Sequence, residues 1–309
     1  MTRRVLLTGA TGFMGRRVFS ALVDAGWDVV CASRDADERS YREPTRTWVR
    51  FDVHEPSTVD DALQNIDAVL YLIHSMGQTG DFEIKERAAA ETLLGAAETA
   101  KVKRIVYLGG VAPTGEASKH LRSRILTGEI LRGGGVPTIE LRAGMIIGAG
   151  GQSWQMVRDL SARLPFMILP SWLQNHSQPV AVADVVFALV RSLELAPAVR
   201  GVFDLPGPET LTGEELLKRV AALLGRRPYT LRVPLLTPRL SSYWLKVITR
   251  ADFGIAQELV AGLTSDLVAQ NQLFWSLTPE RVPTALDVAA LSALREEQGQ
   301  LGLGTRVLE

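Results

Sequence analysis

Short apolar runs alternate with longer amphipathic stretches over the first half of the chain. Six strands are predicted, at residues 3–10, 27–33, 47–53, 67–74, 102–110 and 136–144. Four of them contain apolar runs without polar alternation, namely VLL, VVC, VLYLI and IVYL. Helical spacing separates them, at residues 12–26, 56–66, 81–100 and 117–135. Strands buried on both faces and joined by helices predict an α/β fold with a doubly wound parallel sheet.

The pattern changes after about residue 150. Residues 154–174 and 234–263 are rich in Pro, Trp and Leu, whereas 178–194 and 212–225 have the spacing of amphipathic helices. We therefore expect a doubly wound domain at 1–150 and a smaller, mainly helical lobe at 151–309. Residues of about 178–205 are expected to return to the core of the first domain. The lobe is expected on the carboxyl edge of the sheet, where ligands bind in this architecture.

The first predicted strand runs directly into the glycine-rich stretch TGATGFMG, which opens a helix. Gly9, Gly12 and Gly15 recur at three-residue spacing, and in this strand-to-helix context they indicate a dinucleotide-binding turn. The first glycine allows a tight turn, the second a close approach to a pyrophosphate, and the third close helix packing. The whole loop is therefore a candidate cofactor site, which adds the following residues: Thr8, Thr11, Phe13 and Met14.

The second predicted strand ends in the sequence CASRDADE. Proteins that bind NAD carry an acidic residue at this point, about 20 residues beyond the glycines. Here Ser33 and Arg34 stand there instead, and a guanidinium can clamp a 2′-phosphate. The sequence therefore favours NADPH, while Asp35 keeps NADH open as an alternative.

Composition narrows the class of partner. Lys and Arg together number 34, as do Asp and Glu, so the formal net charge is zero. This balance argues against nucleic acid as the main partner. Cys31 is the only cysteine, which excludes an internal disulfide and suits the cytoplasm, and no pair of histidines has metal-ligand spacing, so we assign no metal. No window is long and apolar enough for a transmembrane segment.

The first 150 residues resemble the short-chain dehydrogenase/reductase superfamily, in its extended and atypical branches. The segments TGATGFMG, YLIHSM, HLRSR and ELRAGMIIGAG are similar to those of NAD(P)-binding proteins that include NmrA-like redox regulators and an accessory subunit of respiratory complex I. The resemblance extends through QPVAVADV and SSYWLKVIT. It implies cofactor contacts at the following residues: Asp52 and Val53 beside the adenine, Leu72, Ile73 and His74 after the fourth strand, and Gly144 and Met145 near the nicotinamide.

The catalytic residues of the superfamily are replaced in this sequence. The family carries a Ser at the end of the fifth strand and a Tyr-xxx-Lys pair on the next helix, whereas here Gly109 or Gly110, His120 and Arg124 stand at these positions. An imidazole titrates closer to neutral pH than a phenol does, so His120 is a candidate proton donor. Arg124 is a candidate for holding the cofactor, and His74 is a third candidate catalytic residue. A polar, partly solvated helix face is the alternative interpretation of His120 and Arg124.

The second lobe is expected to supply the substrate contacts. Trp154, Trp172 and His176 are the candidates, and an aromatic, apolar pocket favours a hydrophobic, quinone-like small molecule. We therefore predict an NADPH-dependent oxidoreductase that lacks the usual triad. A non-catalytic NADPH sensor and a structural subunit are the alternatives. The segment LSSYWLKVI also leaves a peripheral membrane contact open.

Overall fold

A computed structural model describes residues 3–73, 82–164, 166–233 and 265–298. The chain divides into two compact units. Unit 1 comprises Met1–Gly110, Arg122–Arg142 and Val186–Phe203, and unit 2 comprises Val111–Leu121, Ala143–Val185 and Asp204–Glu309. This division does not follow the boundary that we predicted at residue 150. The segment that we expected to return, 178–205, contributes residues 186–203 to unit 1.

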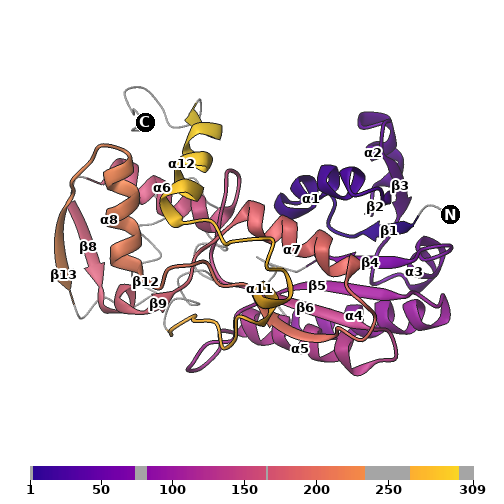
Figure 1. The fold of residues 1–309 in the computed structure, drawn as a ribbon. Helices are drawn as coiled ribbons and strands as arrows, with labels where there is room; N and C mark the ends of the chain where they lie inside the picture. The colour runs from indigo at the N-terminus through magenta and orange to yellow at the C-terminus, as the bar shows by residue number, and fades with distance from the viewer. Residues whose placement is uncertain (1–2, 74–81, 165, 234–264, 299–309) are drawn as a thin grey trace. The chain divides into compact units, whose positions relative to one another are not determined.

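Unit 1 is built on a seven-stranded sheet in the order β11-β6-β5-β4-β1-β2-β3 (Figure 1). Its strands are β1 (Arg4–Leu7), β2 (Asp28–Ser33), β3 (Thr47–Arg50), β4 (Ala68–Tyr71), β5 (Arg104–Gly110), β6 (Thr138–Ala143) and β11 (Gly201–Asp204). The pairs β1–β2, β2–β3, β1–β4 and β4–β5 are parallel. This confirms the predicted doubly wound α/β class.

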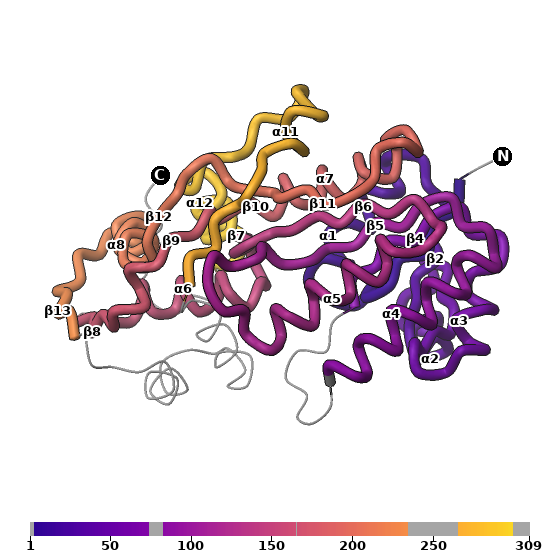
Figure 2. Tube along the Cα trace, turned by 90° about the horizontal axis from the view of Figure 1, so that it is seen from below, coloured from indigo at the N-terminus to yellow at the C-terminus, as the bar shows by residue number. Residues whose placement is uncertain are grey.

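Helices cover both faces of this sheet (Figures 1 and 2). They are α1 (Phe13–Asp24), α2 (Ala36–Arg42), α3 (Pro56–Ala62), α4 (Phe82–Thr99), α5 (Lys119–Gly133) and α7 (Val182–Glu194). Side chains of α3, α4 and α5 share one buried core with the strands. The alanines that α4 contributes to it, Ala89, Ala90, Ala96 and Ala97, let the helix lie close to the sheet.

The sheet order reverses at β1, which lies between β2 and β4. Leu7 is level with Cys31 of β2 and Leu70 of β4. The crossovers from β1 and β4 therefore leave in opposite directions along the sheet. A crevice at the carboxyl ends of such strands is where α/β proteins bind ligands.

Unit 2 is mainly helical, with three two-stranded sheets among its described residues. Its elements are β7 (Ile146–Ile147), α6 (Gln152–Arg163), β8 (Phe166–Pro170), η1 (Ser171–Gln174), β9 (His176–Ser177), β10 (Val180–Ala181), β12 (Leu211–Thr212), α8 (Gly213–Leu223), β13 (Tyr229–Val233), α11 (Leu273–Leu277) and α12 (Leu286–Glu296). Pairing is parallel in β7–β10 and β8–β13 and antiparallel in β9–β12.

A buried polar cluster joins α6 to the end of α12. The indole Nε1 of Trp154 donates to Oε2 of Glu297 at 2.9 Å, and Nη1 of Arg158 lies 2.8 Å from the same oxygen. Asp159 pairs with the other side of the Arg158 guanidinium. Because all four side chains are buried, losing one partner would leave another polar group unsatisfied.

The structure also contains elements that periodicity did not predict. Helix α2 is short and largely charged, with the sequence ADERSYR, so it has no apolar stripe to recognise. Strand β8 and helix α6 divide residues 152–170, where the mixed Pro, Trp and Leu content hid both. These three elements lie in two segments, and the conformation of each segment depends on packing more than on local sequence pattern.

Candidate functional site

The turn between β1 and α1 accepts only glycine at two positions. Gly9 has φ +64°, and a Cβ atom there would lie 2.9 Å from the carbonyl oxygen of Leu72. A Cβ atom on Gly15 would lie 2.2 Å from the carbonyl oxygen of Gly9. The turn is therefore pressed against the end of β4 on one side and against α1 on the other. This close packing leaves the cradle that a diphosphate requires.

Helix α1 begins without a side-chain cap. Gly12 is its N-cap residue, with extended backbone angles, and no side chain accepts from the first turn. The N–H groups of Phe13 and Met14 have no partner within the helix, as at any helix start. Together with the helix dipole they favour an anion at this point. Thr11 is half-buried in the same turn.

Thr8 fastens the end of β1 to β4. Its buried hydroxyl donates to the carbonyl oxygen of Leu70 at 3.3 Å and accepts from the N–H of Leu72 at 3.0 Å. The hydroxyl is thus used within the protein and fixes Leu72 and Ile73 beside the glycine turn. His74, the third predicted residue of this segment, lies outside the described residues.

The end of β2 presents a cation to solvent. The Ser33 hydroxyl accepts from the N–H of Asp35 at 3.2 Å, which holds the start of α2. Arg34 is exposed between them, and no ion pair to it exists among the described residues. Its guanidinium is therefore available to a ligand.

The loop after β3 is held by its own polar groups. The Asp52 carboxylate accepts from the N–H of His54 at 2.9 Å, and the Thr58 hydroxyl accepts from the N–H of Asp52 at 2.9 Å. Val53 is buried. The Asp52 carboxylate thus faces its own turn, while Val53 packs inward.

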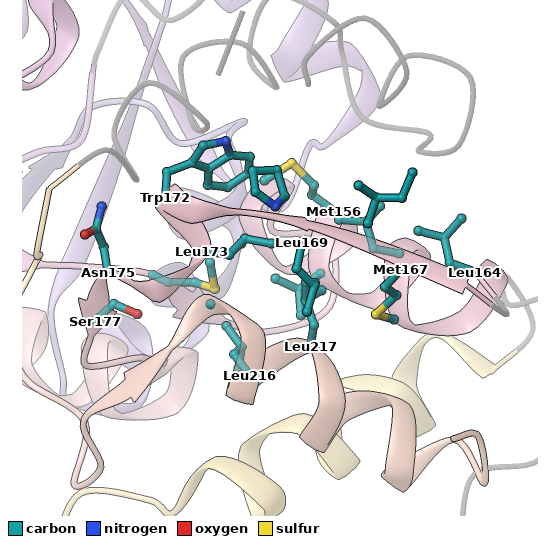
Figure 3. Close-up of a pocket in the computed structure, with 16 residues that line it drawn as sticks. Met156, Leu164, Met167, Leu169, Trp172, Leu173, Asn175, Ser177, Leu216 and Leu217 are labelled. Carbon is teal, nitrogen blue, oxygen red and sulfur yellow. The ribbon is translucent and has the colours of Figure 1, made fainter. Parts of the chain in front are cut away.

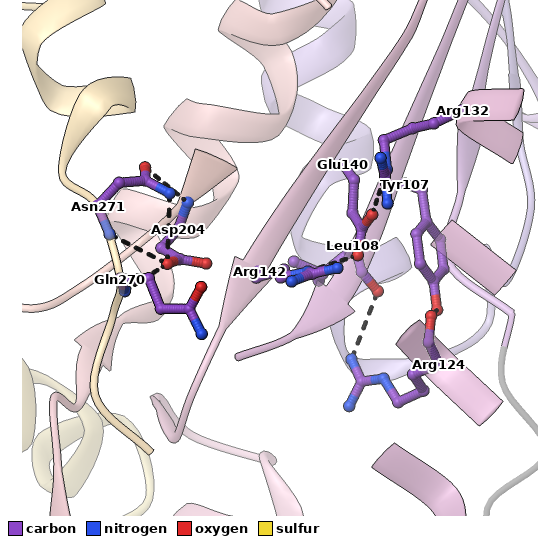
Figure 4. A network of polar contacts seen from close by, with 9 residues as sticks. All are labelled: Tyr107, Leu108, Arg124, Arg132, Glu140, Arg142, Asp204, Gln270 and Asn271. Atoms are coloured by element: carbon purple, nitrogen blue, oxygen red, sulfur yellow. Dashed lines mark hydrogen bonds and ion pairs between the residues drawn. The ribbon is translucent and has the colours of Figure 1, made fainter. Parts of the chain in front are cut away.

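At the end of β5 a buried carboxylate fills the place of a side chain. Glu140 of β6 is fully buried (Figure 4), and a Cβ atom on Gly109 would lie 3.1 Å from its Oε1. A Cβ atom on Gly128 of α5 would lie 2.3 Å from its Cδ. Two guanidinium groups hold the carboxylate, with Nε of Arg132 at 2.8 Å and Nε of Arg142 at 2.7 Å. The glycines at 109 and 128 make room for this ion cluster.

Sequence reasoning did not find the Glu140 cluster. One signal was present, because TIELRA places a single acidic residue within an apolar, buried strand. Such a residue is paired when it is buried. Its partners and the two glycines become visible only in the folded structure.

Arg124 lies next to this cluster. Its Nη2 donates to the carbonyl oxygen of Leu108 at 3.4 Å, and the Tyr107 hydroxyl donates to the carbonyl oxygen of Arg124 at 3.1 Å (Figure 4). Burial raises the pKa of Tyr107, so this phenol stays a neutral donor. The Nε of Arg124 is buried and has no hydrogen-bond partner among the described residues. Such a group is a candidate for contact with a ligand.

His120 and Arg124 are one turn apart on α5, as their spacing predicted. His120 is half-buried and falls in unit 2, whereas Arg124 falls in unit 1.

Unit 2 holds an apolar cavity of about 50 Å³ (Figure 3). Met145, Met156, Met167 and Trp172 are among its lining residues, and Leu side chains from α6, β8, η1 and α8 complete it. The Trp172 indole N–H is buried and has no partner among the described residues. This volume is well below that of most small-molecule pockets, so an apolar ligand would enter only if the flexible methionine side chains moved.

The other predicted residues of unit 2 are not among the lining residues. Trp154 is fully buried in the Glu297 cluster, and half-exposed His176 has its Nδ1 at 3.5 Å from Oδ1 of Asp266. Gly144 lies beside the backbone of Gln178. Of the residues predicted in this unit, Trp172 and Met145 thus line the cavity.

A comparison with known families matches residues 9–132 to a family of NAD(P)H-binding domains. The chain contains an NAD(P)H-binding domain. This domain includes the glycine turn, Arg34, Gly109 and Arg124. Its cofactor is thus a nicotinamide nucleotide, which the tight glycine cradle and uncapped α1 fit.

Relatives extend the likeness beyond this domain. The chain is 25% identical to the photosystem II assembly factor Ycf39 of Synechocystis, over 75% of this chain and 71% of that protein. It is 25% identical to a ceramide reductase of Caulobacter vibrioides, over 74% and 73%. The triphenylmethane reductase of Citrobacter, solved with NADP(H), has the same fold, with a TM-score of 0.73 at 15% identity over 94% and 100%. These findings confirm the resemblance to atypical short-chain dehydrogenase/reductases.

The described residues include no helix long and apolar enough to cross a membrane. They also include no group of three acidic, histidine or cysteine side chains placed to hold a metal ion.

Proposed function

We propose that the protein is an NADPH-dependent oxidoreductase of the cytoplasm that transfers a hydride to a hydrophobic, aromatic or quinone-like small molecule. The observation that carries this proposal is the apolar methionine, leucine and tryptophan lining of the unit 2 cavity, in a chain with an NAD(P)H-binding domain. The cavity is small, so the methionine side chains must move to admit such a molecule. Relatives named for ceramide and triphenylmethane substrates support the same class of substrate.

In this proposal Arg34 selects the phosphorylated cofactor. Its guanidinium stands exposed at the end of β2 and pairs with the 2′-phosphate, while the Ser33 hydroxyl keeps the turn in place. The first-turn N–H groups of α1 hold the diphosphate. Asp52, Val53, Leu72 and Ile73 line the adenine and ribose.

Arg124 and His120 take the positions of the family's Lys and Tyr. The buried, unpartnered Nε of Arg124 donates to a ribose hydroxyl of the cofactor, which resolves its missing hydrogen bond. The His120 imidazole donates the proton that the product requires. Bound NADPH supplies the hydride. Gly144 and Met145 lie near the nicotinamide, and Trp172 contacts the substrate.

A spectrophotometric assay tests the proposal. NADPH absorbance is followed with a panel of quinones, conjugated enones and ketones, and substrate-dependent loss is the expected result. His120→Ala is expected to slow turnover by about 10²–10⁴-fold, the usual contribution of a general acid. Tight NADPH binding with no oxidation across the panel contradicts the proposed hydride transfer.

A non-catalytic NADPH sensor is the second candidate. It is favoured by the β5 end, where glycines occupy both predicted positions of the family serine and Glu140 fills the space beside Gly109, so neither position supplies a hydroxyl to polarise a substrate carbonyl. A sensor binds NADPH as tightly as the reductase does but oxidises none of it. Calorimetry combined with the assay above separates the two.

A further inference from the structure

The outer face of the β8–β13 sheet carries four large apolar side chains that are turned to solvent. Phe166 and Ile168 of β8 are 68% and 46% exposed, and Tyr229 and Leu231 of β13 are 73% and 65% exposed. The strands pair in parallel with Tyr229 opposite Phe166 and Leu231 opposite Ile168. The rings of Phe166 and Tyr229 stack with centroids 5.4 Å apart. The four residues thus form one patch, named here the outer face.

The inner side of the same sheet explains why the patch is not core. Met167 and Leu169 alternate with the exposed residues of β8 and are buried in the core of unit 2. Figure 1 shows β8 and β13 paired beside α8, which belongs to that core. Single exposed apolar residues are common on proteins, whereas a contiguous group marks an interaction surface.

Arginines gather at one end of this sheet. Because the strands are parallel, the residues that precede them share an end, and these include Arg163 before β8 and exposed Arg226 and Arg227 before β13. Arg163 also lies 3.6 Å from Asp159. Arg232 of β13 is paired with Glu214, its Nε lying 3.0 Å from Oε2. Arg226 and Arg227 are exposed, and no ion pair to either exists among the described residues, so these two arginines make the end of the outer face basic.

We propose that the outer face docks peripherally on an anionic phospholipid surface. Aromatic and aliphatic side chains enter the boundary between headgroups and acyl chains, and neighbouring arginines pair with the phosphates. The exposed Arg226 and Arg227 favour an anionic occupant. A second copy of this chain is the competing occupant, and the oligomeric state measured below distinguishes the two.

Docking would also bring the cavity of unit 2 close to molecules dissolved in the lipid. Strand β8 separates the two, because Ile168 belongs to the outer face while Met167 and Leu169 line the cavity on the inner side. If the proposed function holds, a lipid-soluble substrate would be drawn from the bilayer. The docking itself does not depend on hydride transfer, so the two proposals can fail separately.

Vesicle flotation with the full chain tests this proposal. Vesicles of phosphatidylcholine alone are compared with vesicles that also contain phosphatidylserine, at low and high salt. The double variant F166S/Y229S removes the stacked rings, and R226Q/R227Q removes two charges. Tyr41→Ser, at a tyrosine that is 89% exposed on α2, and Arg200→Gln, at an exposed arginine of unit 1, are the matched controls. NADPH binding and circular dichroism report that each variant is folded.

The expected result is flotation with the anionic vesicles, weakened by salt and at least about tenfold weaker in each double variant. The two controls should float as the unmodified protein does. Absence of flotation, or equal flotation of the folded double variants and the controls, overturns the proposal. A dimer in solution that F166S/Y229S converts to a monomer also overturns it, because the outer face is then a protein interface. Flotation with no NADPH oxidation by any substrate leaves docking supported and the proposed hydride transfer contradicted.

Discussion

The carboxylate of Glu140 occupies the space into which a side chain at Gly109 would point. A Cβ atom at Gly109 would lie 3.1 Å from Oε1 of Glu140 and 3.3 Å from Cε1 of Tyr107. Arg132 and Arg142 hold this carboxylate, so it cannot easily withdraw. At Gly109, one of the two predicted positions of the family serine, the space for a side chain is thus already filled.

Restoring the serine should therefore fail. Gly109→Ser is expected to lower the free energy of unfolding by about 1–3 kcal/mol, as overpacking does, without raising the rate of NADPH oxidation. Urea denaturation and the turnover assay measure the two effects. A stable variant with faster turnover would show that Glu140 yields to the new side chain.

Gly128 should tolerate a methyl group even less. Gly128→Ala would place a Cβ atom 2.3 Å from Cδ of Glu140, so α5 or the ion cluster must move. We expect a loss of about 2–3 kcal/mol in urea denaturation. Gly95→Ala in the neighbouring helix α4 is the control, because its Cβ atom meets nothing within 4 Å and helix propensity then favours Ala by about 1 kcal/mol. Equal stability of both variants would contradict the clamped position of Glu140.

Arg34 should set the preference for NADPH. Arg34→Ala is expected to weaken NADPH binding by on the order of tenfold to a hundredfold, the value of a charged hydrogen bond, and to leave NADH binding almost unchanged. Calorimetry with both nucleotides measures this. Arg42→Ala, on the exposed side of α2, is the matched control. An equal loss of affinity for NADPH and NADH would show that Arg34 does not bind the 2′-phosphate.

Acid should destabilise unit 2 through Glu214. Burial alone would raise the pKa of this carboxyl group, but hydrogen bonds from Lys218, Arg232 and Gln174 lower it from 4.5 to about 2. A folded-state pKa below the unfolded one stabilises the protein above pH 4.5, and this contribution is lost as the pH falls toward 2. Its size is at most about 3 kcal/mol, because solvent screens the exposed side chains of Lys218 and Arg232.

Denaturation across that pH window tests the Glu214 prediction. The free energy of unfolding should fall less steeply between pH 4.5 and 2 in Glu214→Gln than in the unmodified protein. If the free energy of unfolding falls equally steeply in both proteins, groups other than Glu214 cause the sensitivity to acid.

Cys31 should be unreactive in the folded protein. It is fully buried in β2, and burial raises the pKa of its thiol to about 11, although Arg46 opposes this shift. The thiolate that attacks a disulfide reagent is therefore scarce at neutral pH. Modification should require unfolding, so its rate should rise with urea. Rapid labelling of the native protein would contradict the buried position.

The sequence by itself determined the chemistry that depends on neighbours along the chain. The apolar runs predicted the parallel sheet, and the glycine spacing predicted the turn in which Gly9 and Gly15 are the residues that fit. The place of Arg34 was predicted in the same way, since it directly follows a strand whose end could be located, while its role in cofactor choice stays a prediction. These features lie within one βα unit, where local backbone geometry decides the structure.

Tertiary structure alone decided what depends on contacts between distant segments. Glu140 meets Gly109, Gly128, Arg132 and Arg142 because β5, β6 and α5 pack together, and no spacing in the sequence records that contact. Trp154 and Trp172 looked alike in the sequence, yet one bonds to Glu297 in a core and the other lines the cavity. The outer face arises because β8 pairs with a strand more than 60 residues away. Burial is a property of the packed chain, and it separates residues that the sequence presents as equivalent.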